Sequence, residues 1–209
     1  MNLLDADALS KLAHWNLLKE LAPLTGVVDA ETATLSSLLH RAAKSCKKPD
    51  GKLFQDAIVA ARAYHYLEQL APLPEPAEDF LALVQQVPAI DPGEALLLAA
   101  LRAHADALLI TGDKRALNAL VNTVPSAVLA SFSNRIITIE QIVLALLKSK
   151  SVDWLRQHIC PYKTLDKAIG IVMGSDCLAP AESVEAGLRS YISDLRSSTG
   201  TLLRSTEPF

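Results

Sequence analysis

Four short apolar runs alternate with longer segments of helical pattern along this chain. The runs lie at about residues 2–5, 26–29, 107–111 and 135–138. They are too short for ordinary helices, and the last is rich in β-branched residues, which favour strands. Because helices separate the runs, the connections between them are crossovers, and crossovers join parallel strands. The order of elements therefore predicts an α/β fold, with a small parallel sheet flanked by helices in three layers.

Helical periodicity accounts for most of the remaining chain. Half of the residues are apolar, and Leu and Ala, both strong helix formers, supply most of them. Asp7 is suited to cap a first helix that continues to about Leu21. Asp91 with Glu94, and Thr138 with Gln141, have the spacing of capping boxes at two later helix starts. Further helices are expected over 31–44, 53–70, 80–87, 91–105 and 113–129 (interrupted by Pro125), and another with an apolar face from Ile139 to Leu147.

The chain divides by pattern near residue 150. Residues 1–149 contain every strand signal, whereas residues 150–209 read as an all-helical C-terminal extension. The last helix of the extension includes Val184 to Leu195, and residues 197–209 read as a loose tail. The apolar helix faces of the extension leave three roles open: packing on the core, binding a protein partner, or forming a homodimer.

The charge balance excludes one class of nucleic-acid protein. The chain has 20 Lys and Arg against 23 Asp and Glu, for a net charge of −3. A polycationic coat is therefore excluded, while an enzyme that holds nucleic acid through local patches is not. A basic cluster is a candidate for such a patch, with a solvated turn as the alternative. It comprises Arg41, Lys44, Lys47, Lys48 and Lys52.

Cysteine usage and hydropathy favour a reduced, cytoplasmic protein without membrane contact. Cys46, Cys160 and Cys177 form no CxxC pair, so neither a zinc site nor a disulfide framework is expected. The first residues lack the basic and apolar regions of a signal peptide. No apolar run approaches the length of about 18 residues that a membrane span needs.

Acidic residues follow two of the expected strands. Asp5 comes directly after the first apolar run, and Asp113 follows the run that ends at Thr111. Glu94 opens the helix that leads into the latter strand, and such a helix starts at the carboxyl end of the sheet. Since ligands of parallel α/β sheets bind at that end, Asp5, Glu94 and Asp113 are expected to converge there. Clustered carboxylates without His or Cys suit a hard cation, Mg²⁺ or Mn²⁺.

These segments resemble the PIN domain family of metal-dependent ribonucleases. LLDADAL at 3–9 is similar to the opening strand and first acid of that family, and residues 93–116 to its third acid, strand and T-x-D motif. RIITIEQIV at 135–143 is similar to its last strand and following helix. The resemblance covers roughly residues 1–149.

The resemblance implies a PIN-like three-layer fold and hydrolysis of RNA phosphodiester bonds, on single-stranded or structured RNA. It makes Asp5, Glu94 and Asp113 metal ligands and catalytic residues, with Thr111 and Asp7 in support. Lys114 and Arg115 adjoin the acids, and with Lys47 and Lys48 they are candidates for contact with substrate phosphates.

One family feature is missing, which leaves a second hypothesis open. Where the PIN pattern places a Glu on the helix after the second strand, this chain has Ser36 and Ser37. In addition, Glu94 and Asp113 stand where capping alone would explain them. The alternative is thus a catalytically weakened PIN-like protein that acts as a protein- or RNA-binding module.

Overall fold

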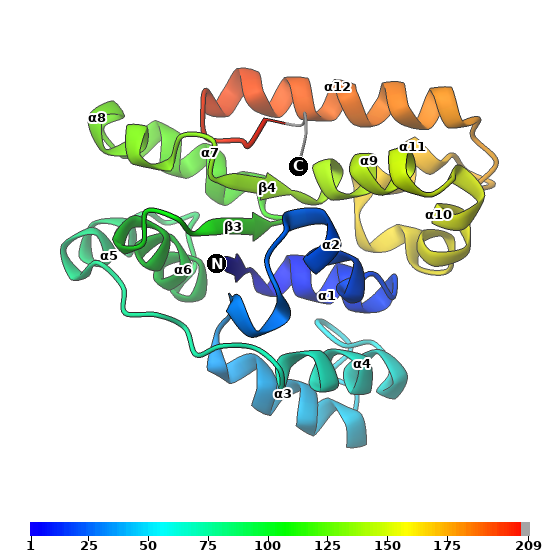
Figure 1. Cartoon of the computed structure of the whole chain (residues 1–209), viewed down its shortest axis with the longest axis horizontal. Coiled ribbons are helices and arrows are strands. Elements are labelled where there is room, and N and C mark those ends of the chain that lie inside the picture. The colour runs from blue at the N-terminus through cyan, green and yellow to red at the C-terminus, as the bar shows by residue number, and fades with distance from the viewer. Residues whose placement is uncertain (206–209) are drawn as a thin grey trace.

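A parallel sheet forms the middle layer of the computed structural model, which describes residues 1–205 (Figure 1). Within these residues, four strands pair in the order β2-β1-β3-β4, and every pairing is parallel. The predicted α/β fold with a small parallel sheet is confirmed. The strands are β1 (Asn2–Leu4), β2 (Thr32–Ala33), β3 (Leu108–Thr111) and β4 (Ile136–Thr138).

Helices cover both faces of the sheet and account for most of the described chain. They are α1 (Ala6–His14), α2 (Leu21–Thr25), α3 (Ser36–Lys47), α4 (Ala57–Leu67), α5 (Glu78–Val84), α6 (Pro92–Ala103), α7 (Lys114–Thr123), α8 (Ser126–Leu129), α9 (Ile139–Ser149), α10 (Val152–Ile159), α11 (Lys167–Met173) and α12 (Ala181–Thr199). The predicted capping box at the start of α6 is complete, and at the start of α9 the Gln141 side chain accepts the Thr138 backbone N–H at 3.0 Å. Among the described residues, no helix is long and apolar enough to cross a membrane.

The two faces of the sheet bury separate apolar clusters. Leu4, Ile110 and Ile137 point into a cluster that they share with α1, α4, α9 and the C-terminal helices. The residues one position earlier in these three strands are Leu3, Leu109 and Ile136. They point to the other face, into a second cluster shared with α5, α6 and α7. Successive side chains of a strand point to opposite faces of the sheet. Helices pack on both faces, so the sheet becomes the middle of three layers.

The second strand does not lie where the sequence pattern placed it. Residues 26–29 were expected to form it, but Val28 is 57% exposed and Asp29–Glu31 is a 3₁₀ turn. The strand is formed by Thr32–Ala33, which are buried beside Asn2 and Leu3 of β1. A strand of two residues carries almost no periodic signal, so only tertiary pairing reveals it.

Three helix boundaries also differ from the prediction. The first helix ends at His14 instead of near Leu21, and Asp7 does not cap it, because Asp5 occupies the N-cap position. The helix expected from residue 31 starts at Ser36, after β2. The helix expected from residue 53 starts at Ala57, because the Asp56 carboxylate caps it and the Asp50 carboxylate accepts three backbone N–H groups in the preceding turn.

The end of the chain is ordered further than expected. Instead of a loose tail from residue 197, α12 continues to Thr199, and Leu202 and Leu203 are buried. Leu203 pairs with Ile136 at the open edge of β4, where two apolar residues cover strand groups that would otherwise face water. Residues 206–209 of the predicted tail lie outside the described residues.

Two cysteines that were expected to be free thiols are joined. Cys160 and Cys177 form a disulfide across 17 positions, and Cys46 is a free thiol. The turn between α10 and α11 and the loop after α11 bring the two sulfurs together. A spacing of this length has no sequence signature, which is why the prediction was wrong here.

Candidate functional site

Asp5 ends β1 and occupies a buried position at the carboxyl edge of the sheet. Its side chain is 5% exposed, and its Oδ2 accepts a hydrogen bond of 3.2 Å from the Thr111 hydroxyl of β3. The register of β1 and β3, which pairs Leu4 with Ile110, places these two residues side by side. Burial and the charge of Asp7 raise the pKa of Asp5 to about 6, against the opposing effect of the Thr111 hydrogen bond.

Glu94 lies in the first turn of α6 at the same edge. Its carboxylate accepts the backbone N–H of Asp91 at 2.8 Å, and its own N–H donates to the Asp91 carboxylate at 2.8 Å. Burial raises the pKa of Glu94 to about 7, and the charges of Asp113, Asp91 and Asp5 add to the rise. The acids predicted to converge are therefore close enough to interact electrostatically. The same side chain also serves as a helix cap.

Asp113 is the N-cap of α7. Its carboxylate accepts the N–H groups of Arg115 at 2.8 Å and Ala116 at 3.0 Å, and the Arg115 guanidinium lies 3.2 Å away. Burial alone would raise the pKa of Asp113, but these hydrogen bonds outweigh it and lower the pKa. Its backbone N–H donates to the Thr111 hydroxyl, which thus connects Asp113 with Asp5.

A small cavity lies between the first two acids. Asp5, Glu94 and Thr111 line it together with leucines of α6, α7 and β3, and it has room for about one water molecule. Within residues 1–205, no Lys, Arg or His forms an ion pair with Asp5 or Glu94. Nearby carboxylates without a cationic partner are a donor set that suits a hard cation.

The side chains of Asp5, Glu94 and Asp113 are not arranged around one common metal position. Among the described residues, no group of three or more His, Cys, Asp or Glu is arranged to hold one metal ion. Mg²⁺ needs no such group, because it is usually bound by one or two carboxylates and keeps several water ligands. The pair Asp5 and Glu94 therefore fits Mg²⁺ or Mn²⁺ by its chemistry.

Half-exposed Asp7 belongs to an ion-pair network, otherwise buried, that the sequence patterns did not point to. The Lys11 ammonium lies 2.6 Å from the Asp7 carboxylate and 2.8 Å from that of Asp166, the N-cap of α11. Burial lowers the pKa of Lys11, but the two neighbouring carboxylates have the larger combined effect and raise it. Only the fold brings Lys11 and Asp166 together, since they are 155 positions apart. The network attaches the C-terminal helices to the acidic edge.

A second lysine at this edge is also held by an acid. Lys114 forms an ion pair with Glu140, which is 1% exposed, and its ammonium lies 5.7 Å from the centre of the Tyr191 ring. Glu140 comes two residues after β4, as Asp113 comes two residues after β3, so the strand-end rule could have found it. Arg115, the other predicted phosphate contact here, is exposed and pairs only with Asp113 among the described residues.

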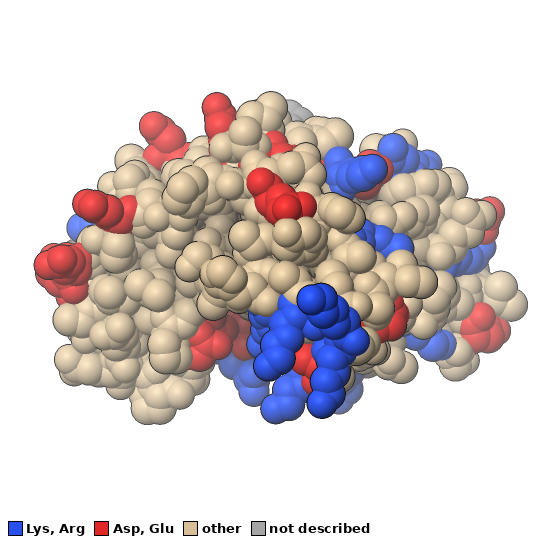
Figure 2. All heavy atoms as spheres, turned by 90° about the horizontal axis from the view of Figure 1, so that it is seen from below, with Lys and Arg blue, Asp and Glu red and all other residues tan. Residues whose placement is uncertain are grey.

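Lys47 and Lys48 lie away from the acids, at the far end of α3. Figure 2, which looks onto the face that carries α3 and α4, shows one dense group of basic side chains. Ser36 and Ser37 are exposed at the opposite end of this helix, in its first turn. The structure therefore separates the predicted phosphate contacts into two places, with Lys114 and Arg115 beside the acids.

Comparison with known proteins identifies no relative. No protein-family model matches the chain, and no curated protein or solved structure matches it either.

Proposed function

We propose that this chain is a divalent-cation-dependent endoribonuclease of PIN-like type. The observation that carries the proposal is the cavity at the carboxyl edge, lined by Asp5, Glu94 and Thr111, whose two carboxylates have no cationic partner in the described chain. Carboxylates gathered at this end of a parallel sheet are typical of ligand-binding sites. Hydrolysis assisted by Mg²⁺ or Mn²⁺ is the reaction that best suits an acidic site without His or Cys.

Each residue at this edge has a distinct role in the proposed site. Asp5 and Glu94 would hold the ion, and Asp113, the N-cap of α7, adds negative charge at the same edge. A bound Mg²⁺ or Mn²⁺ supplies an activated water and neutralises charge on the phosphate. The Thr111 hydroxyl orients Asp5 through its hydrogen bond. Lys114 and Arg115 present positive charge to phosphates next to the scissile bond.

The wider setting of the enzyme is also part of the proposal. RNA is the substrate, and a protein partner or a second copy of the chain binds through the C-terminal helices. A cytoplasmic location remains a prediction, and the disulfide between Cys160 and Cys177 weighs against it, because disulfides are rare in reducing compartments.

A second function has an observation in its favour. Glu94 and Asp113 already accept backbone N–H groups at the starts of α6 and α7, so stability alone explains both acids. With Ser36 and Ser37 in place of the missing acid, the chain would then be an RNA- or protein-binding module without cleavage. The two functions differ in one observable, metal-dependent cleavage of RNA.

The test compares cleavage of a structured and a single-stranded RNA, with Mn²⁺ or with EDTA, by four proteins. They are the wild type, Asp5→Asn, Asp113→Asn and the control Glu182→Gln, which changes an exposed acid of α12. Asn caps helices as well as Asp, so Asp113→Asn removes the charge and keeps the cap. We expect Mn²⁺-dependent cleavage by the wild type and the control only. Equal cleavage by all four, or none by the wild type, refutes the proposed activity.

A further inference from the structure

One exposed face of α3 carries a continuous line of polar and basic side chains. Its members recur at intervals of three and four residues, which places them on one side of the helix. The opposite side, with Leu38 and Ala42, is buried in the core. We call this line the α3 stripe; it consists of Ser37, His40, Arg41, Lys44 and Lys47 on the helix face, together with Lys48, the extended residue that directly follows α3.

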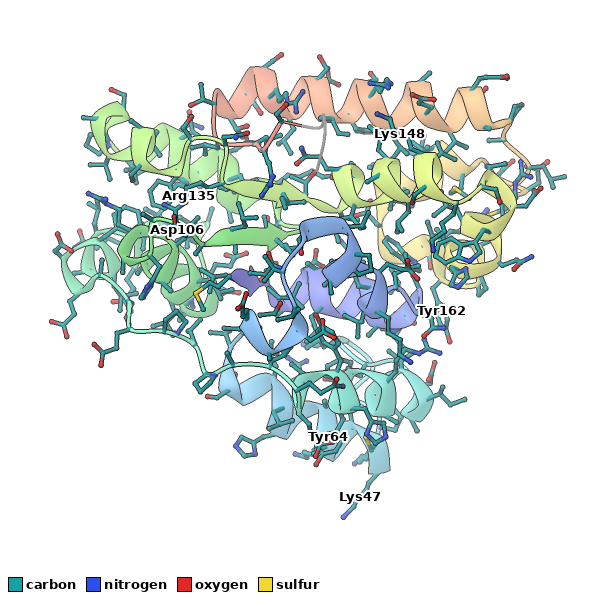
Figure 3. The ribbon with its side chains drawn as sticks, viewed as in Figure 1. Lys47, Tyr64, Asp106, Arg135, Lys148 and Tyr162 are labelled. Atoms are coloured by element: carbon teal, nitrogen blue, oxygen red, sulfur yellow. A yellow bond between two sulfur atoms is a disulfide. The ribbon has the colours of Figure 1, made fainter. Side chains whose placement is uncertain are left out.

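The basic end of the α3 stripe has charges that nothing in the described chain compensates. Within residues 1–205, Lys44, Lys47 and Lys48 form no ion pair, whereas Arg41 lies 2.5 Å from the Asp50 carboxylate. All three lysines are exposed. Figure 3 shows Lys47 extending from the end of α3 away from the body of the molecule. Three free ammonium groups on one face form a local site for a polyanion in a protein whose net charge is −3.

The other end of the α3 stripe lies beside the candidate acidic site. Leu35, just before α3, lies so close to Gly93 that a Cβ on Gly93 would be 2.6 Å from its Cδ1. Gly93 precedes Glu94, and the Thr34 hydroxyl donates to the carbonyl of Leu4, next to Asp5. Since α3 has 12 residues, it extends about 18 Å from this edge to the lysines.

We propose that the α3 stripe binds the backbone of single-stranded RNA and directs it to Asp5 and Glu94. The delivery of RNA to Asp5 and Glu94 rests on the proposed function, whereas the binding of RNA by the α3 stripe does not. Cationic side chains at the last two turns of one helix face recur about every 5 Å, which suits the repeating charge of a linear polyanion. A helix with basic residues along one face is a typical electrostatic footprint of a nucleic-acid site.

Two uncharged members of the stripe favour RNA over DNA. Ser37 and His40 are exposed near the acidic end, and neither side chain has a hydrogen-bond partner in the described part of the chain. A hydroxyl and an imidazole can both hydrogen-bond the 2′-hydroxyl, the group that separates RNA from DNA. Ser37 thus acquires a role at the position where a metal-binding Glu was expected.

The test measures binding of a fluorescent ten-residue oligouridine by anisotropy, in EDTA and over a range of salt concentrations. The stripe variant is Lys44→Ala/Lys47→Ala/Lys48→Ala. The control is Lys19→Ala/Arg102→Ala/Lys167→Ala, which removes the same charge from exposed positions elsewhere. Each phosphate contact contributes about 0.7 to the slope of log K against log salt, so the stripe variant should lower the slope by about 2. Its affinity should fall about 10- to 100-fold, with little change in the control.

Three outcomes overturn the proposal. They are failure of the wild type to bind, equal losses in the stripe variant and the control, and competition by polyglutamate as strong as by oligouridine. Oligothymidine should bind more weakly than oligouridine, and Ser37→Ala/His40→Ala should remove the difference. Equal binding of both by the wild type overturns the assignment to RNA. Because EDTA prevents cleavage, stripe-dependent binding by a protein that never cleaves RNA refutes the proposed function and leaves this inference standing.

Discussion

Replacing Asp5 by Asn should stabilise the protein at neutral pH while abolishing cleavage. The folded state raises the pKa of Asp5 from its ordinary 3.8 to about 6, chiefly by burial. A difference of this size corresponds to about 3 kcal/mol of unfavourable free energy when the carboxyl is ionised. An amide of the same shape carries no charge, and its oxygen can still accept the Thr111 hydrogen bond. Asp5→Asn should therefore raise the free energy of unfolding by up to about 3 kcal/mol.

The gain should depend on pH in a definite direction. Because the folded pKa of Asp5 lies above the unfolded value, the penalty of ionisation is complete above about pH 6 and absent below pH 3.8. Urea unfolding of wild type and Asp5→Asn in EDTA should thus differ at pH 7.5 and agree near pH 3.5. Asp113→Asn is the matched control, since its lowered pKa predicts no gain at pH 7.5. Equal effects at both pH values, or a less stable Asp5→Asn at pH 7.5, would refute the reasoning.

Three further substitutions test the surroundings of the acidic edge. Lys11→Met leaves Asp166 buried without its cation, and should cost about 3–5 kcal/mol in urea unfolding; a loss below 1 kcal/mol would contradict the network. Gly112→Ala places a Cβ 2.1 Å from Asp7 Oδ2, so it should turn the half-exposed Asp7 side chain away from Lys11 and lower the Tm by about 1–4 °C; an unchanged Tm would count against this contact. Cys160→Ser should cost about 3 kcal/mol, the value for a loop of this length, and mass spectrometry should find no thiol at Cys177 in the wild type.

The parts of the fold that local pattern encodes were predictable from sequence. The capping box of Asp91 and Glu94 and the apolar run before Thr111 are signals within a few residues, and the structure has both elements. The parallel sheet follows from the alternation of such signals along the chain. By contrast, the two residues Thr32–Ala33 form a strand only because β1 offers them partners.

The positions of two acids at the carboxyl edge were predictable from the same local signals. Asp5 and Glu94 line one cavity, as expected of acids at the carboxyl ends of strands and starts of helices. The pairing of Lys11 with Asp166 joins positions 155 apart, so no spacing rule reaches it. Glu140 is different, because it comes two residues after a strand, as Asp113 does. The spacing of Thr138 and its neighbour Gln141 predicts only the helix start in which Glu140 lies.

The most direct test of the central claim is the anomalous scattering of Mn²⁺ in crystals of the protein soaked at neutral pH. We predict one strong peak at the carboxyl edge of the sheet, within about 2.6 Å of carboxylate oxygens of Asp5 and Glu94. Crystals of Asp5→Asn treated in the same way should lack it. A peak that persists in Asp5→Asn, or density for Mn²⁺ only away from this edge, would contradict the account.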